Sequence, residues 1–431
     1  MCIGRFALFL SACHSATKRS CDIDELQSQA RGAPLGDQVD LDRSFWRAAL
    51  VAVLITGCGS LPVFLVGGLA VQIRDELELP VSQIGLLTAV FFSASAAFSA
   101  SAGRIAERIG AGVAMRISGA GVAVSLIGLA LAPTSLILMV FLVVGGFASA
   151  LAQVGANLHL AKRVDPSRQG FAFGIKQSGI PAATLMGGLA VPLIALTVGW
   201  RWAFALGAVL TLVVVALIPG AGLRARRGEK KQVDRRNVPG LVVLALGGAL
   251  GSGAANAMGS YLVDSSVSAG WGEAAAGLLF AAGSVAGLSM RVGAGWFADR
   301  RVGGRLLWVA GLFLFGSVGF LLQATRQPPL LVPATLLCFA GGWGWPGLFN
   351  FMIVIRNREA PAAATGLTQT GVYLGGVSGP LVFGYVAEHV DYSAAWLGAA
   401  CAGLLASIAV VFARRMMVSV KPAVNAGRAT R

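Results

Sequence analysis

Apolar stretches long enough to cross a lipid bilayer recur through most of this chain, and no other feature restricts its fold as much. A membrane-spanning helix needs about 20 mostly apolar residues. Each stretch is continuous and lacks the alternation of a barrel strand, so we expect an α-helix in every one. The twelve predicted spans are residues 46–71, 82–102, 113–132, 135–159, 170–195, 200–219, 238–263, 274–294, 305–323, 330–354, 364–386 and 394–413.

The small number of charged residues excludes a soluble fold of this length. Only 12% of the 431 residues are charged and 56% are hydrophobic, whereas soluble proteins have about 25% charged and about 45–50% apolar residues. The two or three soluble domains expected for such a length would lack charged surface. The six cysteines include no CxxC pair and no Cys/His spacing of a metal site. We therefore predict no cofactor, no metal and no disulfide framework.

The net charge of +15 is distributed unevenly along the chain. If both termini lie on one side, the loops on the other side hold only Arg74, Arg201 and Arg326. The other Lys and Arg lie in the tails, in the remaining loops or at the ends of spans, except Lys176 and Arg291, which lie further inside predicted spans. Since cytoplasmic loops carry the basic excess, we predict a multi-pass protein of the cell membrane with both termini cytoplasmic. This charge then implies no nucleic-acid partner.

The apolar part of the chain consists of two similar halves. Gly103 to Arg108 follows the second span as Gly295 to Arg300 follows the eighth, and Gly174 to Gly179 matches Gly366 to Gly371, all at an offset of 192 residues. We predict an internal duplication of six helices. The expected parts are a disordered tail (1–44), a six-helix bundle (45–223), a basic linker (224–237), a second bundle (238–416) and a tail (417–431).

The repeated segment after the second span carries Gly103, Glu107, Arg108 and Gly110, and its second copy carries Gly295, Asp299 and Arg300. In this motif, the repeat and the twelve spans, the chain resembles the major facilitator superfamily of transporters. The resemblance implies an all-α membrane protein of two pseudo-symmetric six-helix bundles, not an enzyme, that works by alternating access. It also implies that the motif lies in short loops. Its charges Glu107, Arg108, Asp299 and Arg300 would hold the two bundles together on the cytoplasmic side.

The two cations inside predicted spans are the strongest candidates for a binding site. A charge near the bilayer centre costs about 2.5–3.5 kcal/mol on insertion scales, and no Asp or Glu falls inside a predicted span to pair with Lys176 or Arg291. The resemblance implies that helices five and eight are neighbours, so that both cations flank one cavity. We predict that they bind an anionic substrate group. The alternative is that both long side chains reach out to the cytoplasmic interface.

Other polar or aromatic residues inside the spans are further candidates for the substrate path. The resemblance implies that helices one, four, seven and ten line it. Each of these residues has an alternative role in hydrogen bonding or packing between helices. The candidates are Gln153, Asn157, Gln177, Asn256, Tyr261, Trp343, Asn350, Gln369 and Tyr373.

The predicted function is secondary active or facilitative transport of a small organic or inorganic anion by a monomer in the lipid bilayer, with any coupling ion left open. The absence of a buried acid favours exchange, facilitated movement or proton transfer that involves the substrate itself. A rival is an exporter of lipophilic drugs. Against it, helix four reads Phe141 to Gly146 without the arginine that such exporters carry, and helix five lacks their Gly-Pro. A second rival, a sensor on a transporter fold, would need larger tails.

Overall fold

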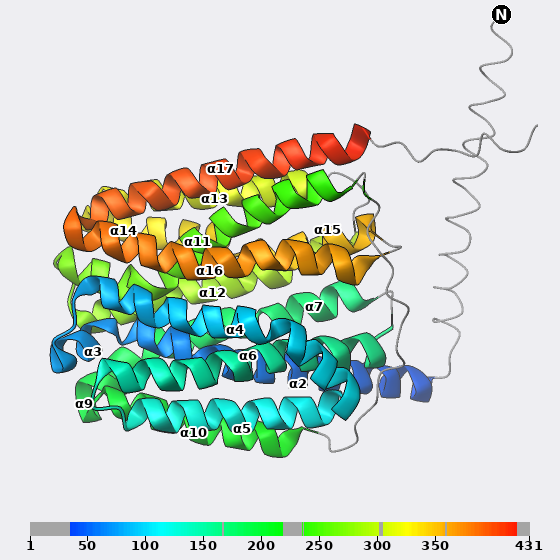
Figure 1. Ribbon diagram of the computed structural model, residues 1–431, viewed down its shortest axis with the longest axis horizontal. Coiled ribbons are helices and arrows are strands. Elements are labelled where there is room, and N and C mark those ends of the chain that lie inside the picture. The colour runs from blue at the N-terminus through cyan, green and yellow to red at the C-terminus, as the bar shows by residue number, and fades with distance from the viewer. Residues whose placement is uncertain are drawn as a thin grey trace, which may run out of the picture. The chain divides into compact units, whose positions relative to one another are not determined.

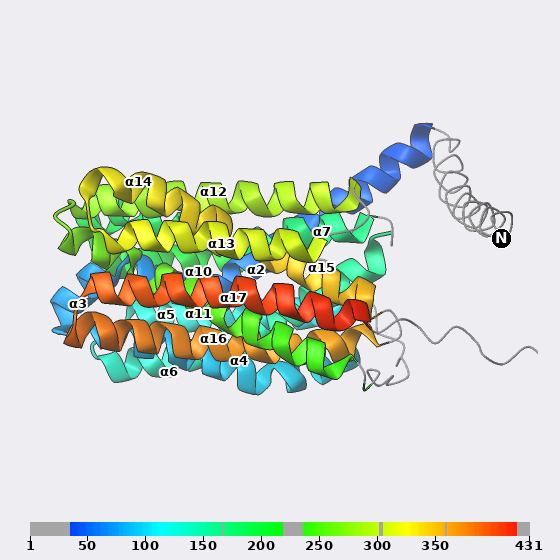
Figure 2. The same ribbon diagram turned by 90° about the horizontal axis from the view of Figure 1, so that it is seen from above.

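A computed structural model describes residues 35–165, 168–218, 235, 237–300, 305–357 and 360–419. The described residues up to 48 and those from 49 onward form two separate units, and the second of these units is the helical bundle. Figures 1 and 2 show the long helices of this bundle lying side by side along one direction. Most of the predicted tails and of the linker 224–237 lies outside the described residues.

The described residues are almost entirely helical, and no strand occurs among them. In the first half the helices are α2 (Leu35–Gly68), α3 (Ala70–Leu77), α4 (Val81–Ile109), α5 (Ala111–Ala130), α6 (Ser135–Arg163), α7 (Gln169–Gln177), α8 (Gly179–Ala190), the π-helical turn η2 (Val191–Ala195), α9 (Leu196–Val198) and α10 (Trp200–Leu217). In the second half they are α11 (Val238–Ser268), α12 (Glu273–Arg300), α13 (Arg305–Ala324), α14 (Pro328–Leu337), the π-helical turn η3 (Cys338–Gly342), α15 (Pro346–Arg356), α16 (Pro361–His389) and α17 (Tyr392–Ser419).

These elements occupy the twelve predicted spans, which confirms the all-helical membrane fold. Within the described part of the chain, eleven helical segments are long and apolar enough to cross a membrane. Helix α16 covers the remaining predicted span, 364–386, and carries Thr365, Thr368, Gln369 and Thr370. Two spans are interrupted helices. The fifth consists of α7, α8, η2 and α9, and the tenth of α14, η3 and α15.

Several helices are longer than their apolar stretches. Helix α2 begins at Leu35, eleven residues before the predicted span that starts at 46. Helix α4 continues to Ile109 and α12 to Arg300, so the repeated motif lies in their last turns rather than in loops. Glu and Arg are good helix formers, which is why a helix does not end where its apolar pattern ends. Among the first copy's residues only Gly110, between α4 and α5, has a positive φ, of 89°.

The prediction that no acidic residue lies inside a span is wrong for Asp264. Helix α11 extends to Ser268, beyond the predicted end at 263, and Asp264 is 5% exposed on its last turns. The apolar pattern ends at residue 263 because Asp264 is charged. The helix continues because partners from other helices stabilise this buried charge. These partners are described below.

Small residues allow the helices to pack closely. A Cβ placed on Gly375 of α16 would lie 1.9 Å from the carbonyl oxygen of Ala249 on α11, and one on Gly188 of α8 would lie 2.6 Å from that of Gly277 on α12. Helix α8 packs against α12 and α4 against α16, so each pair joins the first half to the second. Helices five and eight are therefore neighbours. We call the end of the bundle that carries α3 the α3 end, and the opposite one, where α7 begins, the α7 end (Figure 1).

Candidate functional site

Lys176 and Arg291 are both buried inside the bundle. Lys176 lies near the end of α7 and is 1% exposed, and Arg291 lies on α12 and is 2% exposed. The two side chains are close enough for their charges to interact. Neither belongs to an ion pair formed by the described residues. The burial excludes the alternative in which these side chains reach an exposed surface.

Arg291 donates hydrogen bonds to backbone carbonyls from both halves. Its Nε donates to the carbonyl oxygen of Trp343 at 2.8 Å, and its Nη1 donates to that of Gln177 at 2.6 Å. The guanidinium also lies 5.8 Å from the centre of the Trp343 ring. Its Nη2 is buried and has no partner among the described residues. One donor group of this fixed cation therefore remains free.

Both carbonyls are available because two helices are interrupted. Helix α7 ends at Gln177, and Pro181, four residues on, lacks the N–H that would bond to the carbonyl of Gln177 in a continuous helix. Trp343 lies in the break between η3 and α15, which begins at Pro346. Unpaired carbonyls at the carboxyl end of a helix carry partial negative charge. They stabilise the Arg291 guanidinium without a carboxylate.

Gln153 bonds to Lys176, and Gln177 and Asn350 lie on helices that contact α12, which carries Arg291. Lys176 Nζ donates to Oε1 of Gln153 on α6. Gln177 Oε1 and Asn350 Oδ1 are buried with no partner in the described part of the chain. Helices α7, α12 and α15, which carry Gln177, Arg291 and Asn350, contact one another. The arrangement offers two cations with free N–H donors, and it is suited to holding an anion.

The other predicted path residues do not join this group. Asn256 donates to the carbonyl and hydroxyl of Ser252 within α11, and the Tyr261 hydroxyl donates to the carbonyl of Val81 at 3.1 Å, near the α3 end. Tyr373 of α16 lies beside Ser99 of α4. Asn157 is exposed and Gln369 is half-buried. Tyr261 and Tyr373 therefore make contacts between helices, and Asn256 bonds within one.

The contacts of the repeated motif do not test its predicted role in holding the two bundles together, which stays a prediction. Glu107 and Arg108 are exposed and belong to no ion pair among the described residues. The backbone of Asp299 and Arg300 is helical, and their side chains lie outside the described part of the chain. The second copy does mark a close approach between the halves, because a Cβ on Gly174 of α7 would lie 3.6 Å from the Cα of Gly295. Gly103 has no neighbour within 4 Å of such a position.

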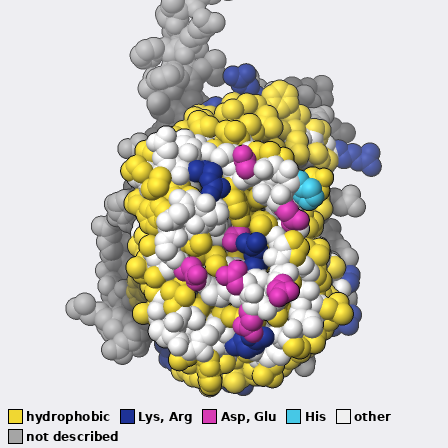
Figure 3. Space-filling model, turned by 90° about the vertical axis from the view of Figure 1, so that its left-hand side faces the viewer, with side chains coloured by type: hydrophobic (Ala, Val, Ile, Leu, Met, Phe, Trp, Pro, Cys, Tyr) yellow, Lys and Arg dark blue, Asp and Glu magenta, His cyan; other side chains and the backbone are white. Residues whose placement is uncertain are grey.

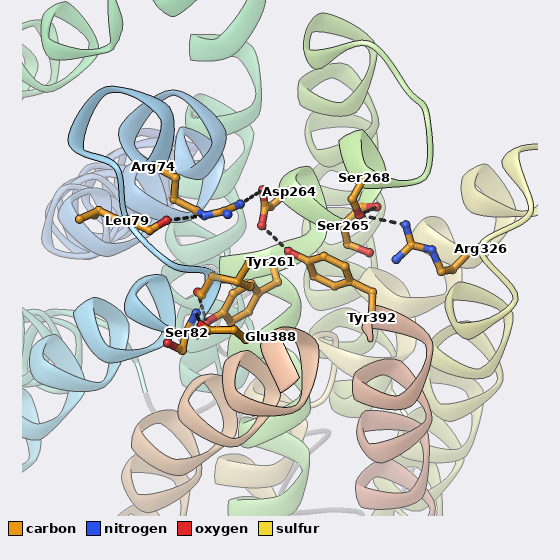
Figure 4. Close-up of polar contacts among 11 residues, drawn as sticks. Arg74, Leu79, Ser82, Tyr261, Asp264, Ser265, Ser268, Arg326, Glu388 and Tyr392 are labelled. Atoms are coloured by element: carbon orange, nitrogen blue, oxygen red, sulfur yellow. Dashed lines mark hydrogen bonds and ion pairs between the residues drawn. The ribbon is translucent and has the colours of Figure 1, made fainter. Parts of the chain in front are cut away.

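A buried polar cluster joins the two halves at the α3 end (Figure 4). Arg74 of α3 forms an ion pair with Asp264 of α11 at 2.7 Å and donates to the carbonyl of Leu79 at 3.2 Å. The Tyr392 hydroxyl of α17 donates to the other oxygen of Asp264. Arg326 lies 5.3 Å from the Tyr392 ring centre and donates to the hydroxyl of Ser268. Asp264 is thus held by one group from each half.

Three further hydrogen bonds cross between the halves near this end. Gln72 donates to Glu273 at 2.6 Å, and the Ser82 N–H donates to Glu388 at 2.8 Å. Thr88 and Ser260 share a hydrogen bond of 2.9 Å. Hydrogen bonds from Ser82 hold the pKa of the Glu388 carboxyl below its usual value, and therefore this acceptor stays charged. Figure 3 shows acidic side chains gathered around basic side chains at this end, within an apolar margin.

Sequence reasoning missed Asp264, Arg74 and Pro181 as site residues. The signals were present, because Arg74 is one of only three basic residues in the loops of one side, and Pro181 interrupts an apolar span. A Pro or Gly interruption at corresponding depth is a pointer to a binding site in transporters. What no local pattern shows is which distant group each one meets.

The comparisons with known proteins agree with this architecture. The family model of the Major Facilitator Superfamily matches residues 52–322 and 244–430. Among solved structures, the chain is similar to a bacterial homolog of the human lysosomal transporter Spinster in an inward-facing and unoccupied conformation. That match has a TM-score of 0.60 at 16% identity and covers 87% of this chain and 96% of the other, so it shows the fold alone. No curated protein matches the chain.

Proposed function

Because this chain belongs to the Major Facilitator Superfamily, and is a membrane transporter rather than an enzyme, we propose that it carries a small organic or inorganic anion bound at Arg291 and Lys176. The observation that carries the proposal is the buried guanidinium of Arg291, with two donors on helix-break carbonyls and Nη2 unpaired. An anion would pair with Nη2 and with the remaining N–H groups of Lys176.

Stability alone is a poor reason to keep two cations in this position. Lys176 and Arg291 are buried, and no described carboxylate pairs with either. Burying a charge is costly, and ionisable groups at membrane depth usually serve function. A lipophilic drug would leave this cost in place, whereas an anion would offset it. This difference supports the anion over the drug-exporter alternative.

The polar cluster supports a rocking mechanism with two alternating openings. We propose that the α3 end faces outward and is closed in this state, because five hydrogen-bonded or ionic pairs join the halves near it. The α7 end then faces the cytoplasm, in keeping with Arg104, Lys162 and Arg163 at the ends of α4 and α6. The termini would both be cytoplasmic. Opening of the α3 end requires the Arg74–Asp264 pair to separate.

A panel of ligands tests the substrate class on the purified native protein. Small carboxylates and oxyanions, organic cations and lipophilic drugs are added separately while the melting temperature is measured. A ligand that binds only the folded state stabilises it by about 2.7 kcal/mol at a hundred times its Kd. We expect anions to raise the melting temperature and to exchange across proteoliposome membranes. Stabilisation by drugs or cations only would replace this proposal with the exporter.

Replacing Pro181 by alanine is expected to weaken anion binding while leaving the fold intact. The new N–H of residue 181 can bond to the carbonyl oxygen of Gln177, and this N–H then competes with Arg291 Nη1 for that oxygen. A hydrogen bond to a charged group contributes about 1.5–3 kcal/mol, so we expect anion affinity to fall about 10- to 100-fold. The added backbone hydrogen bond stabilises the folded state, whereas the loss of proline raises the conformational entropy of the unfolded chain. These two effects on the free energy of unfolding oppose each other, so we expect the ligand-free melting temperature to change little.

Calorimetric titration with the best anion of the panel measures this effect. Pro328→Ala is the matched control, because Pro328 is the first residue of α14, where no N–H is needed. Parent-like affinity in Pro181→Ala would show that the helix break does not position Arg291.

A further inference from the structure

Three buried polar atoms on the helices around the proposed binding site have no partner in the described part of the chain. They are Nη2 of Arg291, Oε1 of Gln177 and Oδ1 of Asn350. Their helices, α12, α7 and α15, contact one another, and Arg291 bonds directly to the backbone of Gln177. Buried polar atoms of native proteins are nearly always paired. Three unpaired ones on three contacting helices therefore indicate a ligand.

The three atoms are of two chemical kinds. Nη2 is a cationic donor, while Oε1 and Oδ1 of the two amides are acceptors. With both amides in the orientation that the structure gives them, an anion that only accepts, such as acetate or sulfate, would pair with Arg291 and Lys176 but would leave both amide oxygens unpaired. An anion with an O–H or N–H beside its charge would satisfy donors and acceptors together.

Building on the proposed function, we infer that the transported anion carries its own hydrogen-bond donor next to the negative group. Two classes of compound share this chemistry. One is a small carboxylate with a neighbouring hydroxyl or amine, and the other is an oxyanion that keeps a proton, such as phosphate. In either class the anionic oxygens face Arg291 Nη2 and Lys176, and the donor faces Gln177 Oε1 or Asn350 Oδ1.

Two pairs of anions of nearly equal size test this on the native protein. Lactate differs from propionate by a hydroxyl group. At mildly alkaline pH phosphate is a dianion like sulfate but keeps one O–H. Titration calorimetry on the full chain in detergent measures the affinity of each. Since a lost hydrogen bond to a buried acceptor reduces affinity about tenfold or more, we expect the donor-bearing member of one pair to bind at least about tenfold more tightly.

The pair that discriminates identifies the class of compound. Preference for lactate over propionate assigns the hydroxy- or amino-carboxylate, and preference for phosphate over sulfate assigns the protonated oxyanion. Equal affinity within both pairs would overturn this inference and would mean that water pairs with the amide oxygens. The proposed function would be unaffected by that result. Binding of none of the four would also overturn the inference. If no anion of the wider panel raises the melting temperature, the proposed function is wrong as well.

Variants locate the acceptor without changing any charge. Gln177→Leu and Asn350→Leu each remove one amide and keep the size of the side chain. We expect one of them to reduce the preference within the discriminating pair about tenfold, while the donor-free anion binds as before. A merely structural role would weaken both members equally. Gln83→Leu, at the first turn of α4 on the α3 end, is the matched control. Parent-like preference in both amide variants would overturn the inference.

Discussion

Replacing Arg291 by glutamine is expected to abolish the response to anions. The variant loses a fixed cation with three donor groups, of which Nη2 is free for a ligand. Removing one partner of a buried, hydrogen-bonded charge pair costs about 2–5 kcal/mol, which is a factor of about 30 to 5000 in affinity. Calorimetric titration and proteoliposome exchange measure the loss. We expect exchange to fall to background.

The ligand-free stability of this variant separates a binding role from a structural one. The shorter glutamine side chain would leave at least one of the two carbonyls unpaired, but the change also removes the desolvation cost of a buried cation. These effects oppose each other, so we expect a melting temperature within a few degrees of the parent. A large fall in melting temperature with an unchanged anion response would show that Arg291 only holds the two halves together.

Two companion variants complete the test of Arg291. Arg291→Lys keeps the charge but lacks the planar, widely spaced donors with which a guanidinium reaches both carbonyls and a ligand at once, so its anion affinity is expected to fall at least about tenfold. Arg414→Gln, on α17, is the matched control, because it removes an arginine that is partly exposed. It is expected to bind anions as the parent does.

Replacing Asp264 by asparagine is expected to open the α3 end. The change removes the charge that pairs with Arg74 and weakens the acceptor of the Tyr392 hydroxyl. The side chain of Arg74 is 23% exposed, which moderates the penalty, and we estimate about 1–3 kcal/mol for the lost pairing. If this energy favours only the closed state, the fraction of open molecules rises about 5- to 150-fold.

Thiol labelling measures this opening. Ser260 lies 2% exposed between α11 and α4, so a Ser260→Cys reporter, in a variant without other cysteines, reacts slowly while the α3 end is closed. Asp264→Asn is expected to speed its reaction. Arg201→Gln is the matched control, because it breaks an ion pair with Glu76 within one half at the same end. Equal labelling rates in Asp264→Asn and the parent would contradict a latch at this position.

The fold and its repeat were predictable because a bilayer allows few backbone structures to cross it. A segment in lipid must pair its own backbone groups, so an apolar stretch of sufficient length has to be a helix. The matches at one offset of 192 residues then predict the duplication. Lys176 and Arg291 were identifiable for the same reason, since a cation inside an apolar stretch is costly wherever its partners lie.

The helix ends and the polar partners were not predictable in this way. Hydropathy marks where apolar residues stop, and α4, α11 and α12 continue past that point. In α11 the added residues are Asp264 to Ser268, which are weak helix formers, so tertiary contacts outweigh local propensity there. Asp264 was misplaced for this reason. Its partner Arg74 is 190 residues away along the chain.

The sequence by itself determined the helices, their order, the duplicated halves and the two buried cations, because neighbouring residues and the solvent decide these. Only the tertiary structure decided what each polar group meets. The carbonyl of Gln177 is freed by Pro181, four residues away, but it is used by Arg291, 114 residues away. Such pairings depend on how whole helices pack, and packing is decided by shape and contact across the bundle rather than by local pattern.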